Sequence, residues 1–447
     1  MTKKKLWTIL TLIILGPPYV LLKYPAMENI LLTYKDDFIT ENVVAEAVCG
    51  QISIGGKLPV SLGNIASRDE GETLLDSCFQ LQAVDYHSHL PHPEYLDSLK
   101  QFLQKSIADS AFPGCAIAVG FQGDLLLQEG FGHYIYDPQS KKVNSQSIFD
   151  LASLTKVVVT TNVTMILYER GLLKLDWKVS EIIPAFKGPD KEKVTIRHLL
   201  THSSGLPAWQ KLYLNIKGKE NIVQAICETG LEYQPGTDYV YSDLGMILMQ
   251  AIIESIVQKP LDLFFTENIA IPLGLKRTFY NPESRWINEI LPTEISDWHK
   301  RLVHGFVHDE NAYAMGGVSG HAGLFSCIED LAVICQLYLN GGIYAHQRII
   351  NTGTIELFTQ RQNLVAGSTR ALGWDTRSEQ GSSAGDYMSL RAFGHTGFTG
   401  TSLWIDPEHQ LFVVLLTNRV YTTRNNQKIQ KVRPLVHNYV MKAIQEL

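Results

Sequence analysis

The sequence is poor in cysteine and has no long apolar run. Six cysteines lie at wide, irregular spacings along 447 residues, and none forms a CxxC pair. This pattern argues against a zinc framework and a disulfide scaffold, and it favours buried free thiols. The first apolar stretch, Leu6–Leu15, is too short to span a bilayer.

A large charge of one sign is also missing. The chain has 39 Lys and Arg against 45 Asp and Glu, a formal net charge of -6. Such a mild balance gives no electrostatic reason to expect nucleic acid or an anionic membrane surface as a partner. The sequence also lacks a Walker loop and an H-E-x-x-H pair, so it shows no nucleotide-binding or zinc-peptidase motif. Its G-x-S-x-G match, GSSAG at 381–385, follows a polar stretch and not the apolar strand that precedes a nucleophile elbow, so an α/β-hydrolase is not predicted.

Residues 1–65 predict a small α/β fragment. Leu6–Leu15 and Ile30–Tyr34 are expected to be strands, Asn42–Cys49 a short helix, and Gly50–Gly63 an extended, turn-rich segment. Three lysines before Leu6 also fit a signal peptide, but no small-x-small cleavage site follows. We predict that Leu6–Leu15 is a core strand, and the alternative is that it is a signal peptide or a membrane anchor. The fragment is marginal for burying a core of its own.

Residues 66–94 are predicted to be a linker. The segment is polar and carries His87, His89 and His92 among prolines. Three histidines so close together can bind a metal. No carboxylate or cysteine stands at matching spacing, so we expect solvated histidines.

Residues 95–447 are predicted to form one large domain. The middle of this stretch is mostly helical, and both of its ends carry a strand hairpin and a helix. The predicted helices are Tyr95–Ser110 and Arg433–Leu447, and the predicted strands are Cys115–Phe121, Leu125–Glu129, Thr401–Ile405 and Leu411–Thr417. Strands from both ends must meet in one sheet. The fold class expected is α+β, with an antiparallel sheet flanked by helices plus a helical lobe.

Ser153 and Lys156 open an apolar, helix-like run, Val157–Tyr168. Residues three apart on a helix share a face, so the amine can reach the hydroxyl. A serine becomes a nucleophile when a base takes its proton, and a lysine serves only if its pKa falls. The pair alone is a weak signal, because an N-cap serine beside a solvated lysine has the same letters.

Two later motifs strengthen the interpretation of Ser153 and Lys156 as a catalytic pair. Tyr241-Ser242-Asp243 precedes an apolar helix, and His395-Thr396-Gly397 precedes a strand. The three motifs in this order resemble those of the serine β-lactamases and penicillin-binding proteins. The Tyr-x-Asp form is closer to class C β-lactamases and related carboxylesterases. The resemblance covers about residues 95–445 and includes IRHLLTHSSGLP, GGVSGHAGLFS and FGHTGFTGTSLWIDPE.

The resemblance implies a role for each matching residue. Ser153 would be acylated, and Lys156 and Tyr241 would move its proton. The backbone N–H groups of Ser153 and Phe398 would form the oxyanion hole. The remaining positions would bind or orient substrate: Asp243, His395, Thr396 and Gly397, the last letting substrate lie close to the strand. It implies no metal and no cofactor.

Two positions depart from the family pattern. Asp243 stands where an asparagine is usual, and a carboxylate there would raise the pKa of Lys156 and weaken it as a base. His395 stands where a lysine would bind a β-lactam carboxylate. Both departures argue against efficient penicillin hydrolysis.

The first 65 residues have a resemblance of their own. ILGPPYVLLKYP followed by GGKLPVSLG is similar to the end of the C-terminal domain of family 3 glycoside hydrolases. A remnant of that domain would lack the sugar-cleaving barrel, so no glycosidase activity is predicted. Together with VHDENAYAMGGVSGHAGLF, it resembles the penicillin-binding protein 4B group and modules that some bacteria fuse to such glycosidases. The family implies the cell envelope.

Three other histidines are predicted to be structural. His198 and His202 flank a helix end, and His321 lies in a glycine-rich loop. The function expected is a serine hydrolase acting on esters, on D-amino-acid peptides or poorly on β-lactams. The alternative is a catalytically weak module that binds peptidoglycan fragments or penicillin.

Overall fold

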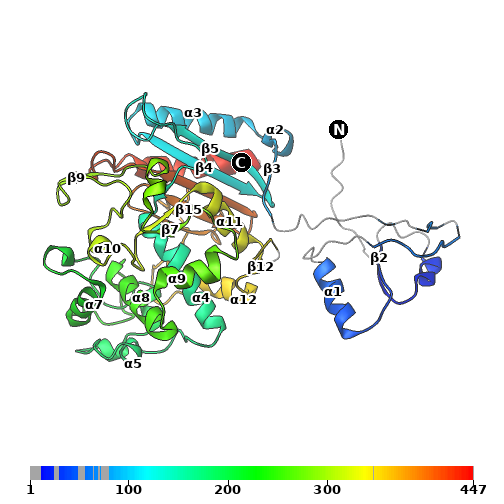
Figure 1. Ribbon diagram of the computed structural model, residues 1–447, viewed down its shortest axis with the longest axis horizontal. Helices are drawn as coiled ribbons and strands as arrows, with labels where there is room; N and C mark the ends of the chain where they lie inside the picture. Colours follow the sequence, from blue (N-terminus) through cyan, green and yellow to red (C-terminus); the bar gives the residue numbers. More distant parts are fainter. Residues whose placement is uncertain are drawn as a thin grey trace. The chain divides into compact units, whose positions relative to one another are not determined.

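The computed structural model describes residues 12–24, 30–48, 56–63, 65–68, 71, 80–345 and 347–445. The chain divides into two compact units, Met1–Gln80 and Leu81–Leu447 (Figure 1). The division falls inside the segment predicted as a linker. Each unit is described by itself.

The first unit is a small α/β arrangement. β1 (Leu12–Leu15) pairs in parallel with β2 (Ile30–Thr33), and the 3-10 helix η1 (Pro18–Lys23) connects them. Helix α1 (Phe38–Val48) follows. Its small core contains Ile14, Leu21 and Leu62. Residues 6–11 of the predicted first strand, Cys49 of the predicted helix, and residues 50–55 lie outside the described residues.

A seven-stranded sheet forms the centre of the second unit, as predicted. Neighbouring strands in this sheet run antiparallel, except that β3 runs parallel to β5. The spatial order is β13 (Asp375–Thr376), β14 (Phe393–Thr396), β15 (Ser402–Asp406), β16 (Leu411–Thr417), β4 (Gly114–Phe121), β5 (Asp124–Gly132) and β3 (Gln82–Ala83). Strands from the two ends of the unit thus meet where β16 pairs with β4.

The turn between β4 and β5 follows from its residues. Gln122 and Gly123 take φ values of 53° and 86°. Two successive positive φ angles fit the tight hairpin turns whose twist matches that of the strands. The Gln-Gly-Asp signal in the sequence therefore predicts this hairpin correctly.

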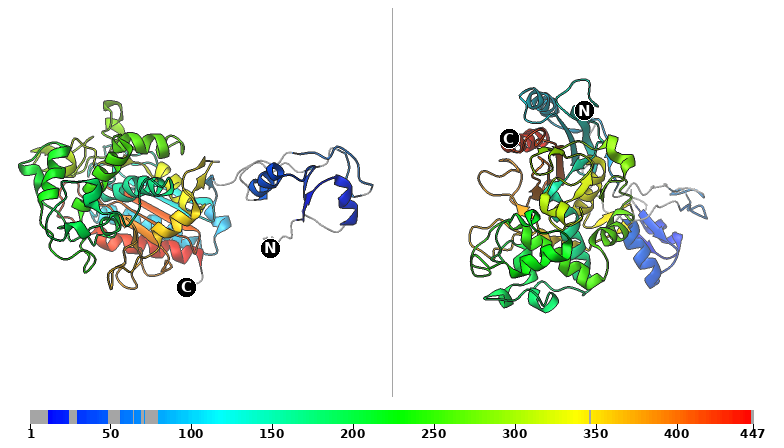
Figure 2. Two further views of the ribbon diagram at one scale, coloured as in Figure 1. Left: turned by 90° about the horizontal axis from the view of Figure 1, so that it is seen from below. Right: turned by 60° about the vertical axis from the view of Figure 1, so that its left-hand side comes forward.

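Alternating side chains along the strands supply two cores. Ile117, Val119 and Val413 face one side, where α3 (Glu94–Ala108) and α13 (Ile429–Ile444) pack against each other and the sheet. Ala118 and Val414 face the other side, which α11 (Ile328–Leu339) covers (Figure 2). This period of two is the geometry of a strand buried on both faces.

A helical lobe lies between the two halves of the sheet in the sequence. Its helices are α4 (Asn162–Glu169), α5 (Val179–Ile182), α6 (Ile196–Leu200), α7 (Lys219–Glu228), α8 (Asp243–Val257), α9 (Leu261–Phe265), α10 (Glu310–Ala314) and α12 (Thr352–Thr359). Short strands complete the unit: β6 (Phe149–Asp150), β7 (Phe279–Tyr280), β8 (Ile295–Ser296), β9 (Arg301–Leu302), β10 (Leu324–Ser326), β11 (Ile343–Tyr344) and β12 (Gln347–Arg348).

Within the described ranges, no single helix is long and apolar enough to cross a membrane. Asp243–Val257 and Leu261–Ala270 pass that test only together, as a pair bent by 72°.

The described cysteines are buried free thiols, and burial raises the pKa of each: Cys115, Cys227, Cys327 and Cys335.

The C-terminal part of the predicted linker is ordered structure. Residues 82–83 form β3, and Tyr86–His89 form α2, which Asp85 caps through the His87 N–H. His87 is exposed and lies 3.2 Å from both Asp85 and Asp97. It pairs with carboxylates, and the described residues place no metal cluster here.

Candidate active site

Ser153 lies in a tight turn at the end of β6. The turn is the 3-10 helix η2 (Ala152–Leu154), and a π-helix, η3 (Lys156–Thr161), follows it directly before α4. The helix-like run predicted at Val157–Tyr168 is therefore helical, but it begins as a π-helix and is α-helical only from Asn162. Thr161 Oγ1 donates to the Lys156 carbonyl at 2.8 Å, and Asn162 Nδ2 donates to the Val157 carbonyl at 3.0 Å. These side-chain bonds add to the backbone bonds of the widened turn, and such turns are frequent at functional sites.

Lys156 is fully buried and has three neighbours. Its Nζ lies 2.8 Å from Ser153 Oγ, 2.8 Å from Asp243 Oδ1 and 3.1 Å from the His321 carbonyl oxygen. Burial lowers the pKa of the ammonium, but the Asp243 carboxylate and the Tyr241 hydroxyl outweigh it and leave the pKa above its ordinary value. The direction predicted from Asp243 is confirmed, and Lys156 is held as an ammonium.

Tyr241 stands directly before α8. Ser242 caps that helix, because its Oγ accepts from the Gly245 N–H at 3.2 Å and donates to the Pro207 carbonyl at 2.7 Å. The Tyr241 ring centroid lies 4.9 Å from Lys156 Nζ. Burial raises the pKa of its hydroxyl, and Lys156 and Ser153 partly offset that rise. The hydroxyl is buried without a hydrogen-bond partner in the described part of the chain.

The loop that carries His321 supports Lys156. The His321 ring lies 2.9 Å from Asp309 Oδ1 and 2.7 Å from Ser319 Oγ, while its carbonyl accepts from Lys156. The predicted role as a loop support agrees with this geometry. Ligand atoms of Asp243, Asp309 and His321 lie within 4.8 Å of one another. The Lys156 ammonium and the His321 ring already pair with these carboxylates, so we assign no metal here.

His395 and Thr396 end β14, the strand nearest this cluster. Burial, Arg370 and Lys156 hold the pKa of His395 well below its ordinary value, so the ring is neutral. Its Nδ1 lies 2.8 Å from the Thr396 carbonyl, and its Nε2 is buried without a partner within the described ranges. The ring centroid lies 5.7 Å from that of Tyr241.

Gly397 is a point of close approach between two segments. A Cβ at this position would lie 2.0 Å from Thr401 Oγ1 and 2.4 Å from the Leu151 carbonyl oxygen. The sequence predicts that this glycine leaves room for substrate. The structure adds a second reason for glycine here, since the chain itself fills the space next to it.

The loop after Gly397 is bonded directly to the turn before Ser153. Thr399 Oγ1 donates to the Asp150 carbonyl at 2.7 Å, and Thr401 Oγ1 donates to the Leu151 carbonyl at 2.9 Å. These bonds join the segments that carry the two predicted oxyanion N–H groups, those of Ser153 and Phe398. Arg433 of α13 also holds the loop, with Nη2 2.7 Å from the Gly397 carbonyl and 2.8 Å from that of Thr401.

Two residues beside Tyr241 were not predicted as part of the site. The His202 ring lies 4.6 Å from the Tyr241 ring, centroid to centroid, and its Nδ1 accepts from the Ser242 N–H at 3.2 Å. The Arg370 guanidinium lies 5.2 Å from the Tyr241 ring centroid. His202 could have been suspected from its place in the THSSG segment, whereas Arg370 belongs to no motif. His198 is structural, as predicted, because it forms a capping box with Thr195 on α6.

The chain resembles known proteins over the second unit. Residues 99–436 match the family model described as Beta-lactamase. The chain is 33% identical over 362 residues to "N-acetylmuramyl-L-alanine amidase" of Bacillus subtilis (strain 168), covering 73% of this chain and 81% of that protein. It is 34% identical over 369 residues to "Putative D-alanyl-D-alanine carboxypeptidase" of Salmonella typhi, covering 75% and 85%.

Solved structures show the same fold. EstCE1, a hydrolase with promiscuous acyltransferase activity, superposes with a TM-score of 0.63 at 20% identity, over 78% of this chain and 99% of that one. A penicillin-binding protein homologue from Pyrococcus abyssi gives a TM-score of 0.61 at 21% identity, over 78% of each chain. These likenesses confirm the predicted β-lactamase and transpeptidase-like fold.

Proposed function

Because the chain belongs to the β-lactamase family of serine hydrolases, we propose that it works through an acyl-enzyme on Ser153. The observation that carries this proposal is the 2.8 Å contact between Lys156 Nζ and Ser153 Oγ, next to the Tyr241 hydroxyl, which has no hydrogen-bond partner among the described residues. Nucleophile and proton carrier within hydrogen-bond reach are the mark of an activated serine.

The proposed reaction has two acyl-transfer steps. The Ser153 hydroxyl loses its proton and its oxygen attacks a carbonyl carbon, which gives a tetrahedral oxyanion. The oxyanion collapses, the leaving amine or alcohol takes a proton, and the acyl group stays on Ser153. Water then repeats the attack and frees the acid. Lys156 and Tyr241 share these proton transfers. In the free-amine form of Lys156, which Asp243 keeps scarce, the Tyr241 hydroxyl passes its proton to the amine as it takes that of Ser153, and the same relay returns a proton to the leaving group.

The substrate class we propose is D-amino-acid peptides of cell-wall origin, with esters as simpler substrates and β-lactams as slow ones. Arg370 supports a substrate that ends in a carboxylate. Its Nε and Nη1 are buried without a partner in the described part of the chain, as are His202 Nε2 and His395 Nε2. Both histidines are neutral, and the Lys156 ammonium beside Tyr241 already pairs with Asp243, which leaves Arg370 as the cation that can meet a substrate carboxylate.

A second candidate function is a binding module for peptidoglycan fragments. The observation that favours it is Asp243, whose carboxylate keeps Lys156 protonated. A lysine that cannot act as a base would slow turnover while leaving the pocket able to bind or to be acylated.

Finer assignments made from the sequence remain proposals. They are a class C type of site, a place in the penicillin-binding protein 4B group, a cell-envelope location and the glycoside hydrolase remnant at residues 1–65. The names of the amidase and carboxypeptidase relatives support a cell-wall substrate.

The test is mass spectrometry of the intact protein after exposure to a fluorescent penicillin and, separately, to a p-nitrophenyl ester. We expect a covalent adduct or ester turnover in the wild type and neither in Ser153→Ala. A stable penicillin adduct without ester turnover would favour the binding module. No adduct and no turnover with either reagent would exclude the proposed hydrolase.

A further inference from the structure

A buried polar network lies behind the predicted oxyanion hole, and the family resemblance assigned no role to its residues. It begins at Asp150, three residues before Ser153. The Asp150 carboxylate is buried, and it accepts from the Ala152 N–H at 2.8 Å and from the His308 N–H at 2.7 Å. Ala152 takes a φ of +47°, which is rare for a residue with a Cβ. Asp150 thus fixes the strained turn that presents Ser153.

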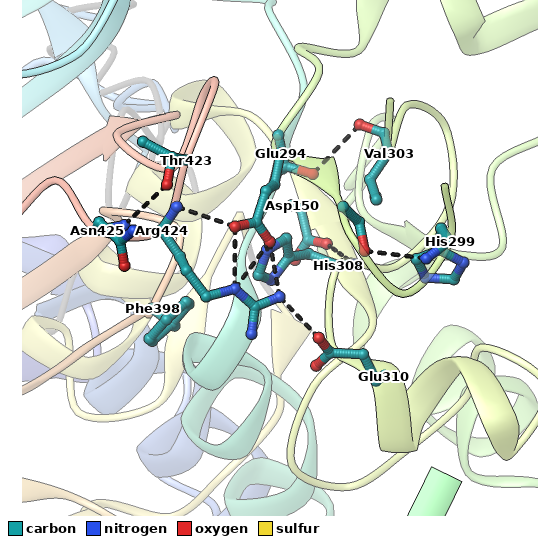
Figure 3. Close-up of polar contacts among 12 residues, drawn as sticks. Asp150, Glu294, His299, Val303, His308, Glu310, Phe398, Thr423, Arg424 and Asn425 are labelled. Atoms are coloured by element: carbon teal, nitrogen blue, oxygen red, sulfur yellow. Dashed lines mark hydrogen bonds and ion pairs between the residues drawn. The ribbon is translucent and has the colours of Figure 1, made fainter. Parts of the chain in front are cut away.

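The network continues through the His308 side chain. Its Nε2 donates to Glu294 Oε2 at 2.9 Å, and both side chains are buried. Arg424 holds Glu294 in two places, with Nε 2.9 Å from Oε1 and Nη2 2.6 Å from Oε2, and its Nη2 also lies 2.7 Å from Glu310 Oε1 (Figure 3). Paired contacts of this kind fix orientation as well as charge.

The same groups surround Phe398. Its ring stacks on the His308 ring, with centroids 5.7 Å apart and 25° between the planes. The Arg419 guanidinium lies 4.6 Å from the Phe398 ring centroid, and Arg419 Nε donates to the Phe398 carbonyl at 2.8 Å. Arg419 is in turn bound to the Arg424 carbonyl at 2.9 Å. The Phe398 ring thus contacts His308 and Arg424 of the network, and its backbone is held by Arg419, which is bonded to Arg424.

We propose that Asp150, His308, Glu294 and Arg424 form a positioning device that sets the backbone N–H of Phe398 relative to that of Ser153. The proposal rests on the proposed function, since it assigns the two N–H groups to the oxyanion. Asp150 bonds to Ala152, His308 and Arg424 lie against the Phe398 ring, and Glu294 joins His308 to Arg424. None of the four is assigned contact with substrate. A shift of about 1 Å in a reacting group is enough to cost roughly 100-fold in rate.

The test uses the full chain and compares three variants. Glu294→Gln keeps the side-chain shape and removes the charge, and Arg424→Lys keeps the charge and removes the paired contacts at a half-exposed position. Asp406→Asn is the matched control. Asp406 is also a buried carboxylate with a histidine partner, His409 at 2.8 Å, but it lies at the far end of β15.

Turnover of a p-nitrophenyl ester is measured together with inhibition by an aryl boronic acid, whose adduct places an oxygen in the oxyanion hole. We expect both network variants to lose about 10- to 100-fold in kcat with KM changed less than about twofold, because the lost interaction acts in the transition state. The inhibition constant of the boronic acid should rise by a similar factor. Asp406→Asn should keep its kcat even where it lowers the unfolding temperature.

Network variants that unfold earlier but keep kcat and boronic acid affinity would show a merely structural role and overturn the proposal. A rise in KM with unchanged kcat would also overturn it. If the wild type shows no turnover that depends on Ser153, the proposed function itself fails. If Glu294→Gln does not fold, Arg424→Lys decides the question.

Discussion

The carboxylate of Asp243 lies 2.8 Å from Nζ of Lys156, inside the site where that lysine contacts Ser153. An opposite charge this close stabilises the ammonium and raises its pKa. Removing the charge must therefore lower the pKa and increase the fraction of free amine at neutral pH.

We expect Asp243→Asn to move the rising limb of the pH–rate profile, where Lys156 loses its proton, to lower pH by about one unit and to raise the rate at pH 7 up to about tenfold. The measurement is the rate of acylation by a p-nitrophenyl ester across pH 6 to 10. Glu220→Gln, an exposed carboxylate on α7, is the control and should leave the profile unchanged. An unmoved profile in Asp243→Asn would show that Lys156 does not set the rate.

Arg370 is expected to select substrates that end in a carboxylate. Its Nη2 lies 3.9 Å from Asp375 Oδ2, but its buried Nε and Nη1 have no acceptor among the described residues. A charged hydrogen bond to such donors contributes about 1.5–3 kcal/mol. In Arg370→Gln, kcat/KM for a D-alanyl-D-alanine peptide should therefore fall at least about tenfold more than kcat/KM for a neutral ester. The neutral ester is the internal control, since it reports any effect on Tyr241. Equal losses for both substrates would assign Arg370 to the support of Tyr241 alone.

Gly397→Ala is expected to damage both activity and stability. The new Cβ would lie 2.0 Å from Thr401 Oγ1 and 2.4 Å from the Leu151 carbonyl oxygen, so the loop after Gly397 must move away from the turn that carries Ser153. We expect a loss of roughly 100-fold in kcat and about 1–3 kcal/mol in the free energy of unfolding. Ester turnover and urea unfolding measure the two effects.

Gly353→Ala provides the matched control for that substitution. Gly353 lies in α12 with no atom within 4 Å of its Cβ position. The Gly353→Ala variant should keep an activity and a free energy of unfolding close to those of the wild type. If Gly397→Ala behaves in the same way, the close approach does not fix the loop.

Glu294 is expected to make stability depend on pH in the acid range. Burial raises its pKa, but His308 and Arg424 outweigh that effect and lower it from 4.5 to about 2. The folded protein therefore binds this proton less readily than the unfolded chain. The stabilisation is present above about pH 4.5 and is lost as the pH falls toward 2.

Urea unfolding at pH 7 and at pH 3 tests this expectation. Glu294→Gln should cost about 2–3 kcal/mol at pH 7, and the difference from the wild type should shrink at pH 3. A difference of the same size at both pH values would mean that packing, and not the charge of Glu294, stabilises this region.

Local sequence determined the elements on which the second unit is built. Apolar runs joined by Gln-Gly-Asp and by Asp-Pro-Glu-His predict the two hairpins, because turn residues and strand alternation act within a few positions. The same is true of Ser153 and Lys156, whose spacing of three places both side chains on one face of a turn whether it is α-helical or not. Tyr241 was found from its motif, and the fold brings it beside them.

Only the tertiary structure decided which distant residues complete the site. Arg370 and His202 lie far from Tyr241 in the sequence, and no local pattern marks Arg370. The Asp150, His308, Glu294 and Arg424 network joins four segments, and its contacts exist only after the sheet and the lobe have packed. The protonation of Lys156 is likewise a balance of burial against neighbouring charge. The sequence names the groups, but the distances that decide the balance are set by packing.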